Sequence, residues 1–152
     1  MTRPLSDLLD VHRELEELFA AHQAALLERD FERARLKLEE FRAELTGHAE
    51  DEERCILPAY ENLETTSERY VKLYYGEHRK LLAIAEELIE RMAKLPKEPS
   101  AADIIAILDR ECFFKDLMAH HDEREKNDLY RALDKHLSED ERVRIWERLE
   151  GL

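Results

Sequence analysis

Apolar residues recur along most of the chain at alternating steps of three and four, which is the spacing of one face of an α-helix. Breaks in this pattern divide the sequence into five predicted helical segments, at about 6–28, 31–62, 68–94, 101–137 and 139–150. The connections between them are short, so consecutive long segments are expected to lie antiparallel. The pattern therefore predicts an all-α fold, an up-down-up-down antiparallel four-helix bundle with a short extra C-terminal helix.

The ends of the predicted helices carry local signals. A serine or threonine followed three residues later by an acidic residue has the spacing of a capping box. Three such pairs are Thr65 with Glu68, Ser100 with Asp103, and Ser138 with Glu141. Pro58 falls inside the second segment, where it predicts a kink or a separate turn. We expect one domain over residues 1–152, with a core bundle at about 5–137 and a C-terminal helix at about 139–150.

Composition supports the helical interpretation and narrows the choice of partners. Only three Gly and four Pro occur among 152 residues, too few for the many turns of a β-sandwich or barrel. The formal net charge of −13 predicts no nucleic-acid partner and no anionic membrane surface. The sequence lacks an apolar stretch of signal-peptide length near its start, which predicts a cytoplasmic protein. Cys55 and Cys112 lie within helical patterns and are expected to be buried thiols.

The inward stripes of the four long segments contain polar residues as well as apolar ones. Each stripe carries one histidine, and in two of them a glutamate follows one turn later. These residues are His12, His48, Glu52, His78, His121 and Glu125. Burying such groups is costly unless they are compensated, and the stripes offer no Lys or Arg at these heights for a salt bridge. Neutral imidazole and ionised carboxylate form the mixed set that iron, manganese or zinc accept.

The positions along the bundle agree with a common centre. His12 and His48 lie at nearly equal distances from the turn that joins their segments. The midpoint of His48 and Glu52 lies as far before the next turn as His78 lies after it. His121 lies about five residues further from its turn than His78 does, an offset of roughly 7 Å at 1.5 Å per residue. We expect an uneven loop or an overhanging helix start to absorb this offset.

The order of the residues separates two kinds of dinuclear bundle. Ferritin-like carboxylate proteins use Glu-x-x-His, and no histidine of this chain has a glutamate three residues before it. A lone His, His-x-x-x-Glu, a lone His and again His-x-x-x-Glu, in this order, resemble the hemerythrin-like (HHE cation-binding) domain. The local text that carries the resemblance is VHREL, HAEDEERCILPAY, GEH and HDEREKNDLY.

The resemblance implies a non-haem centre of two iron ions with carboxylate bridges and an oxo or hydroxo bridge. Glu52 and Glu125 would then be the bridging ligands, and the four histidines the terminal ones. It also implies O₂, NO or peroxide as the small ligand, in sensing, storage or redox response. The first alternative is an oxidase, peroxidase-type or iron-delivery enzyme. The second is a metal-free interaction module whose contact surface lies on the C-terminal helix and includes Val143, Ile145, Trp146 and Leu149. The same helix could equally cap the bundle. The protein could also form a homodimer.

Two further residues have open roles. Oxygen-carrying hemerythrins have a fifth histidine one turn before the ligand of the third helix, where this chain has Tyr74. Tyr74 could ligate iron, donate a hydrogen bond to a bound oxygen species, or only pack. Glu16 stands one turn after His12 and is either an extra ligand, an acceptor for a ligand, or a surface residue. His22 lies about 15 Å from His12 along the helix, too far to share the centre, and is expected to be a buried or bundle-end residue.

Overall fold

The computed structural model describes residues 3–151, and every regular element among them is helical. The predicted all-α class is thus confirmed. The elements are the 3₁₀ helix η1 (Leu5–Leu9), the α-helices α1 (Asp10–Leu27), α2 (Phe31–Asp51), α3 (Leu57–Glu61), α4 (Glu68–Ala93), α5 (Ala101–Arg124), α6 (Tyr130–His136) and α7 (Glu139–Leu149), and the π-helical turns η2 (Glu52–Ile56) and η3 (Glu125–Leu129). None of these helices is long and apolar enough to cross a membrane.

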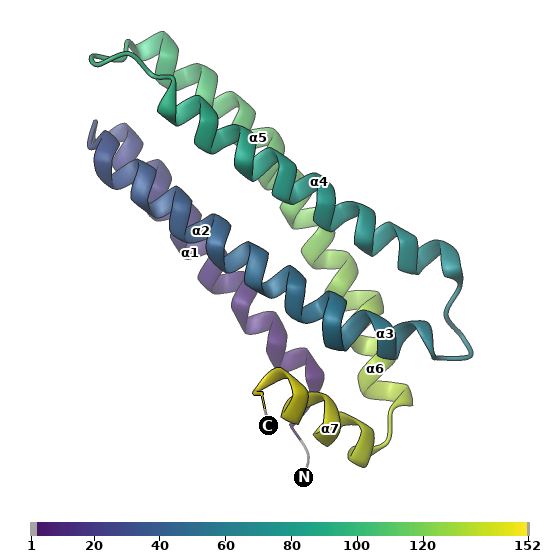
Figure 1. Cartoon of the computed structure of the whole chain (residues 1–152). Helices are drawn as coiled ribbons and strands as arrows, with labels where there is room; N and C mark the ends of the chain where they lie inside the picture. The colour runs from purple at the N-terminus through teal and green to yellow at the C-terminus, as the bar shows by residue number, and fades with distance from the viewer. Residues whose placement is uncertain (1–2, 152) are drawn as a thin grey trace.

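Four long rods make up most of the molecule (Figure 1). The first is α1, the second runs from α2 through η2 into α3, the third is α4, and the fourth runs from α5 through η3 into α6. Helix α1 packs on α2, α2 on α4, α4 on α5, and α5 again on α1. The rods therefore surround one common interior, to which each contributes a stripe of side chains.

Two hydrophobic clusters fill this interior at different heights. The first contains the rings of Phe19, Phe41 and Phe114, whose centroids lie between 5.0 and 5.8 Å apart. The second contains Tyr74 and Trp146 and lies near the end where α7 packs. Along each rod the stripe passes from one cluster to the other through the predicted polar residues. A buried polar layer thus separates two apolar ones.

The helix ends follow the predicted caps in two cases out of three. Ser100 and Ser138 each form a complete capping box, with Asp103 and Glu141 respectively. The predicted box of Thr65 with Glu68 is wrong, because Ser67 is the N-cap of α4 and its side chain makes no capping hydrogen bond.

Of two further expectations, one needs revision. Pro58 lies in the first turn of the short helix α3, which follows the π turn η2, so the second rod is interrupted near this proline as expected. The missing N–H of a proline costs little at the start of a helix. Cys55 is buried as expected, whereas Cys112 is exposed, because it lies on the outer face of α5.

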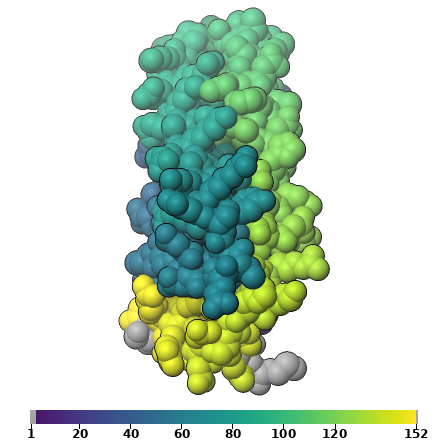
Figure 2. All heavy atoms as spheres, turned by 90° about the vertical axis from the view of Figure 1, so that its right-hand side faces the viewer, coloured from purple at the N-terminus to yellow at the C-terminus, as the bar shows by residue number. Residues whose placement is uncertain are grey.

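The C-terminal helix closes one end of the molecule. Ile145 and Trp146 of α7 are buried in the second cluster, and the indole Nε1–H of Trp146 donates to the carbonyl of Arg3 at 3.1 Å. The carboxylate of Asp134 accepts hydrogen bonds from the backbone N–H groups of Leu5 and Ser6, which holds the start of the chain there too. In Figure 2 the C-terminal residues cover the base of the rods. Of the two roles open for this helix, the structure shows the capping one.

A second polar pair lies inside the first hydrophobic cluster. His22 and Glu111 are both fully buried, with His22 Nε2 2.6 Å from Glu111 Oε2. The other ring nitrogen, Nδ1, lies 2.7 Å from the carbonyl oxygen of Ala34, and the Gln23 amide donates to Glu111 Oε1 at 3.1 Å. His22 is therefore a buried residue with its own partners, well removed from the polar layer.

We predict that Glu111→Leu lowers the free energy of unfolding by about 3–5 kcal/mol, because it leaves His22 buried without its acid. The double variant His22→Leu, Glu111→Leu should recover most of that loss, since an apolar pair can replace a buried polar one. Urea denaturation measures both, with the exposed Glu40→Leu as control, expected to cost no more than about 1 kcal/mol. A single variant as stable as the control would contradict the importance of this pair.

Candidate metal centre

The structure brings the six predicted residues together in the polar layer. They come from all four rods, and five of them are buried, while His12 is partly exposed. Their places are His12 in α1, His48 in α2, Glu52 at the start of η2, His78 in α4, His121 in α5 and Glu125 at the start of η3. The offset expected between His78 and His121 is absorbed, because their rings lie 5.1 Å apart.

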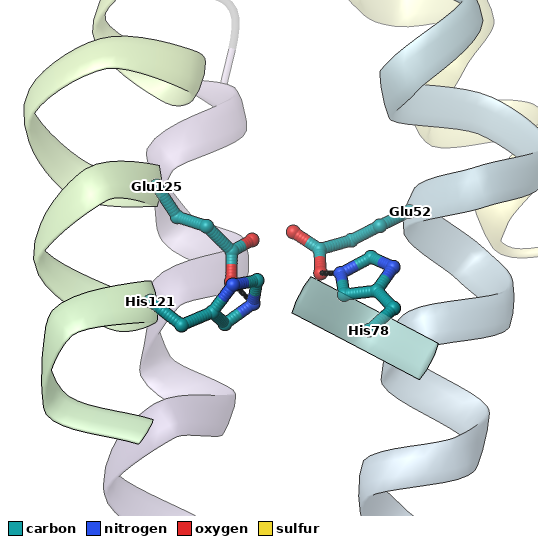
Figure 3. A group of neighbouring side chains, drawn as sticks. All are labelled: Glu52, His78, His121 and Glu125. Atoms are coloured by element: carbon teal, nitrogen blue, oxygen red, sulfur yellow. Dashed lines mark ion pairs between the residues drawn. The ribbon is translucent and has the colours of Figure 1, made fainter. Parts of the chain in front are cut away.

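Two overlapping groups within the layer have the arrangement of metal ligands. Glu52, His78, His121 and Glu125 each offer one ligand atom, and these atoms all lie within 4.8 Å of one another. Figure 3 shows the two carboxylates reaching toward each other from opposite rods, with the imidazoles beside them. His12, His48 and Glu125 form the second group by the same measure. Glu125 belongs to both groups.

Each glutamate contacts one histidine from each of two pairs. The rings of His12 and His48 form one pair, 5.2 Å apart, and those of His78 and His121 form the other. Glu52 Oε1 lies 3.1 Å from His48 Nε2 and 3.2 Å from His78 Nε2. Glu125 Oε1 lies 3.3 Å from His12 Nε2 and 2.6 Å from His121 Nε2. Both carboxylates therefore connect the two pairs.

Several polar atoms of this layer have no hydrogen-bond partner within the part of the chain that the structure describes. They are His12 Nε2, His48 Nε2, Glu52 Oε1, and both carboxylate oxygens of Glu125. Buried polar atoms are nearly always satisfied, and leaving one unpaired costs about 1–3 kcal/mol. Since these atoms face one another across a small space, a cation bound between them would satisfy them together. Nitrogen and carboxylate oxygen are also donors that iron accepts.

A second row of carboxylates orients three of the histidines, and sequence reasoning missed it. Nδ1 of His78 lies 3.3 Å from Glu53 Oε1, and Nδ1 of His121 lies 3.0 Å from Glu77 Oε1. Nδ1 of His12 lies 3.6 Å from Asp122 Oδ1. A carboxylate at Nδ1 favours the tautomer whose Nε2 lone pair is free, as metal-binding histidines require. The signal was present, because each of these acids is a sequence neighbour of a candidate ligand.

Tyr74 does not point into the polar layer. Its hydroxyl donates toward Asp128 Oδ2 at 2.7 Å and lies 3.0 Å from the carbonyl oxygen of Arg124. The Tyr60 hydroxyl donates to the same Asp128 oxygen at 2.7 Å. Of the roles left open for Tyr74, the structure favours packing, with its hydroxyl satisfied inside the second cluster. Burial and the acceptor carboxylate both raise its pKa, so the phenol stays protonated.

The tyrosine that reaches the layer is Tyr130, which sequence reasoning missed. It is fully buried, and its hydroxyl donates to Glu52 Oε2 at 2.7 Å, leaving Oε1 to face the histidines. Tyr130 is the first residue of α6 and directly follows the π turn η3. A regular helical wheel misplaces residues beyond such a turn, which is why the hydrophobic pattern did not predict that Tyr130 faces the layer.

Glu16 is not part of the cluster. Its side chain is exposed on α1, and it acts on His12 and Asp122 only through its charge. Of the three roles considered for Glu16, its position fits that of a surface residue.

The two candidate glutamates share a backbone feature. Glu52 is the first residue of η2 and Glu125 the first residue of η3, so each begins a π turn within an otherwise α-helical rod. Such turns are rare, and they occur frequently at functional sites. Cys55 in η2 and Leu129 in η3 are both buried in the second cluster.

Burial and charge act in opposite directions on the titration of these groups. Burial disfavours the charged form of His12 and lowers its pKa, against the attraction of Asp122. Burial acts the same way on His48 and His78, but the adjacent carboxylate of Glu52 outweighs it and raises both pKa values. The pKa of Glu52 stays well below its usual range despite its burial, because these two histidines favour the ionised form. The Glu52 carboxylate therefore stays ionised, the form in which a carboxylate binds a metal ion.

Comparison with protein-family models gives a match over residues 3–133 to the hemerythrin HHE cation-binding domain. The chain belongs to this family. The match spans all four rods and includes every residue of the polar layer, while α7 lies beyond it. Comparisons with curated proteins and with solved structures gave no match. The resemblance drawn from the sequence is thereby confirmed, and the matched region contains the His and Glu groups that could hold a metal ion.

Proposed function

We propose that this hemerythrin-like domain holds two iron ions in its polar layer. His12 and His48 would bind one ion, His78 and His121 the other, and the carboxylates of Glu52 and Glu125 would bridge them. The observation that carries this assignment is the contact of each glutamate with one histidine of either pair. A single ion would leave one pair of imidazoles unsatisfied, whereas two ions use all six side chains.

The architecture supports the same assignment. We interpret the four rods as an up-down-up-down bundle in one domain, with the polar layer at mid-height and an apolar cluster on either side. In this arrangement the clusters exclude water from the layer, and a drier surrounding strengthens the attraction between carboxylates and cations. The outer acids hold three imidazoles with Nε2 toward the centre, and Tyr130 holds Glu52 in place.

Bound iron would supply a reversible change of oxidation state and affinity for O₂, NO or peroxide. The protein would supply two imidazoles and shared carboxylates to each ion, because no fifth histidine stands at position 74 and Tyr74 is already bonded to Asp128. Metal sites with open positions favour chemistry over storage. We therefore propose a role in sensing or redox response rather than in reversible O₂ transport.

Removing a bridging carboxylate should release metal. We predict about two irons per chain for the protein produced with adequate iron, and less than about one for Glu125→Ala, because that carboxylate contacts both histidine pairs. Tyr74→Phe should keep both ions and is the control, since it also removes a buried polar group. Elemental analysis of the purified proteins decides the matter. Two irons retained by Glu125→Ala would contradict the assignment.

The reaction with O₂ tests the proposed role separately. We expect the fully reduced, iron-loaded protein to be oxidised promptly and irreversibly when mixed with O₂, because its two ions together have four imidazoles where the oxygen carriers provide five. Stopped-flow absorption followed by exposure to vacuum measures this. Uptake of O₂ that persisted for many minutes and reversed under vacuum would show a carrier instead.

A further inference from the structure

A cavity of about 300 Å³ lies between α1 and α5, on the side of the first hydrophobic cluster that faces the metal centre. Its apolar walls are Leu15, Phe19, Phe41, Phe114 and Met118, with Phe41 reaching in from α2. Ala20 and Ala119 lie at its edge and are exposed. Because these two side chains are only methyl groups, they leave the cavity accessible from solvent.

The size of the cavity points to a ligand larger than a diatomic molecule. An apolar cavity of about 150 Å³ is enough to bind benzene. The space here is about twice that, and three of its walls are phenylalanine rings, which stack well on another aromatic ring. A molecule the size of one six-membered ring with a substituent would fit.

The polar groups of the cavity determine what that substituent must be. Gln23 is satisfied within the protein, since its Oε1 accepts from Lys115 at 3.3 Å and its amide nitrogen donates to Glu111. Asp122, in contrast, lines the cavity with a side chain that is 17% exposed. Its Oδ1 is buried, 3.6 Å from His12 Nδ1, so Oδ2 is the oxygen that a molecule in the cavity can reach, and Oδ2 makes no hydrogen bond among the described residues. An unused acceptor at the end of an aromatic cavity calls for an O–H or N–H group.

We propose that this cavity binds a small uncharged aromatic molecule that carries a hydroxyl or amino group, such as a phenol. The ring would lie against the phenylalanines, and its O–H would donate to Asp122. Anions are disfavoured by Asp122, by Glu16 at the edge and by the net charge of −13. The occupant would lie beside His12, adjacent to the metal centre. The cavity is formed by protein atoms alone, so this binding does not depend on the proposed function.

The methionine methyl groups provide a direct test with phenol as the probe. Met118 lines the cavity, whereas Met92 is buried in the same cluster away from it. In the full-length protein labelled at its methionine methyl groups, phenol should shift the NMR signal of Met118 in a saturable way and leave that of Met92 in place. Toluene, which has nearly the same shape and no donor, should bind at least about tenfold more weakly. Toluene binding as tightly as phenol would overturn the role of Asp122.

A matched pair of variants tests the location. Ala119→Leu fills the cavity edge and should weaken phenol binding at least about tenfold, whereas Ala106→Leu makes the same change at an exposed position of α5 outside the cavity and should leave it within about twofold. Glu125→Ala should still bind phenol if it loses metal, which separates this proposal from the previous one. No saturable shift of Met118 in the unaltered protein, or equal binding by both alanine variants, would overturn the proposed site.

Discussion

The placement of six ionisable side chains in the interior between two hydrophobic clusters is the constraint on which the rest of this structure depends. Each rod must carry its polar residue at the same height, or an imidazole or carboxylate would face an apolar layer. Glu52 lies beside His48 and His78 and shows how these groups partly compensate one another, because its carboxylate raises the pKa of both imidazoles while they keep its own pKa low. The atoms that remain unpaired show that this compensation is incomplete without a cation.

Support for the layer comes from residues next to the candidate ligands in sequence. Glu53 follows Glu52 yet lies beside His78 of another rod, and Glu77 precedes His78 yet lies beside His121. Arg124 in turn donates to Glu77 at 3.2 Å, so the support extends to the surface. Adjacent helical residues point about 100° apart, which allows one to face the centre while its neighbour reaches the next rod. This arrangement ties the rods together at the height where they carry the most charge.

Much of the fold and of the centre could be predicted because it follows from helical periodicity. The stripes containing His12 and His48 placed both on the inner face, and equal distances from a turn placed them opposite each other. The partners of His22 were missed although Glu111 stands on the inward stripe of its rod, three residues before Phe114, because periodicity gives the face of a residue and not its partner on another rod. Tyr130 was missed for a related reason, since the π turn before it changes the register that a regular helix would have. Contacts between rods depend on side-chain reach, which periodicity does not encode.

The central claim is that two metal ions lie between two histidine pairs and share two carboxylates. The most direct test is a crystal structure of the iron-loaded protein with data collected on either side of the iron absorption edge. Two anomalous peaks in the polar layer are predicted, one beside the pair of His12 and His48 and the other beside the pair of His78 and His121, with Glu52 and Glu125 between them. A single peak, or iron bound elsewhere with the layer empty, would contradict the account.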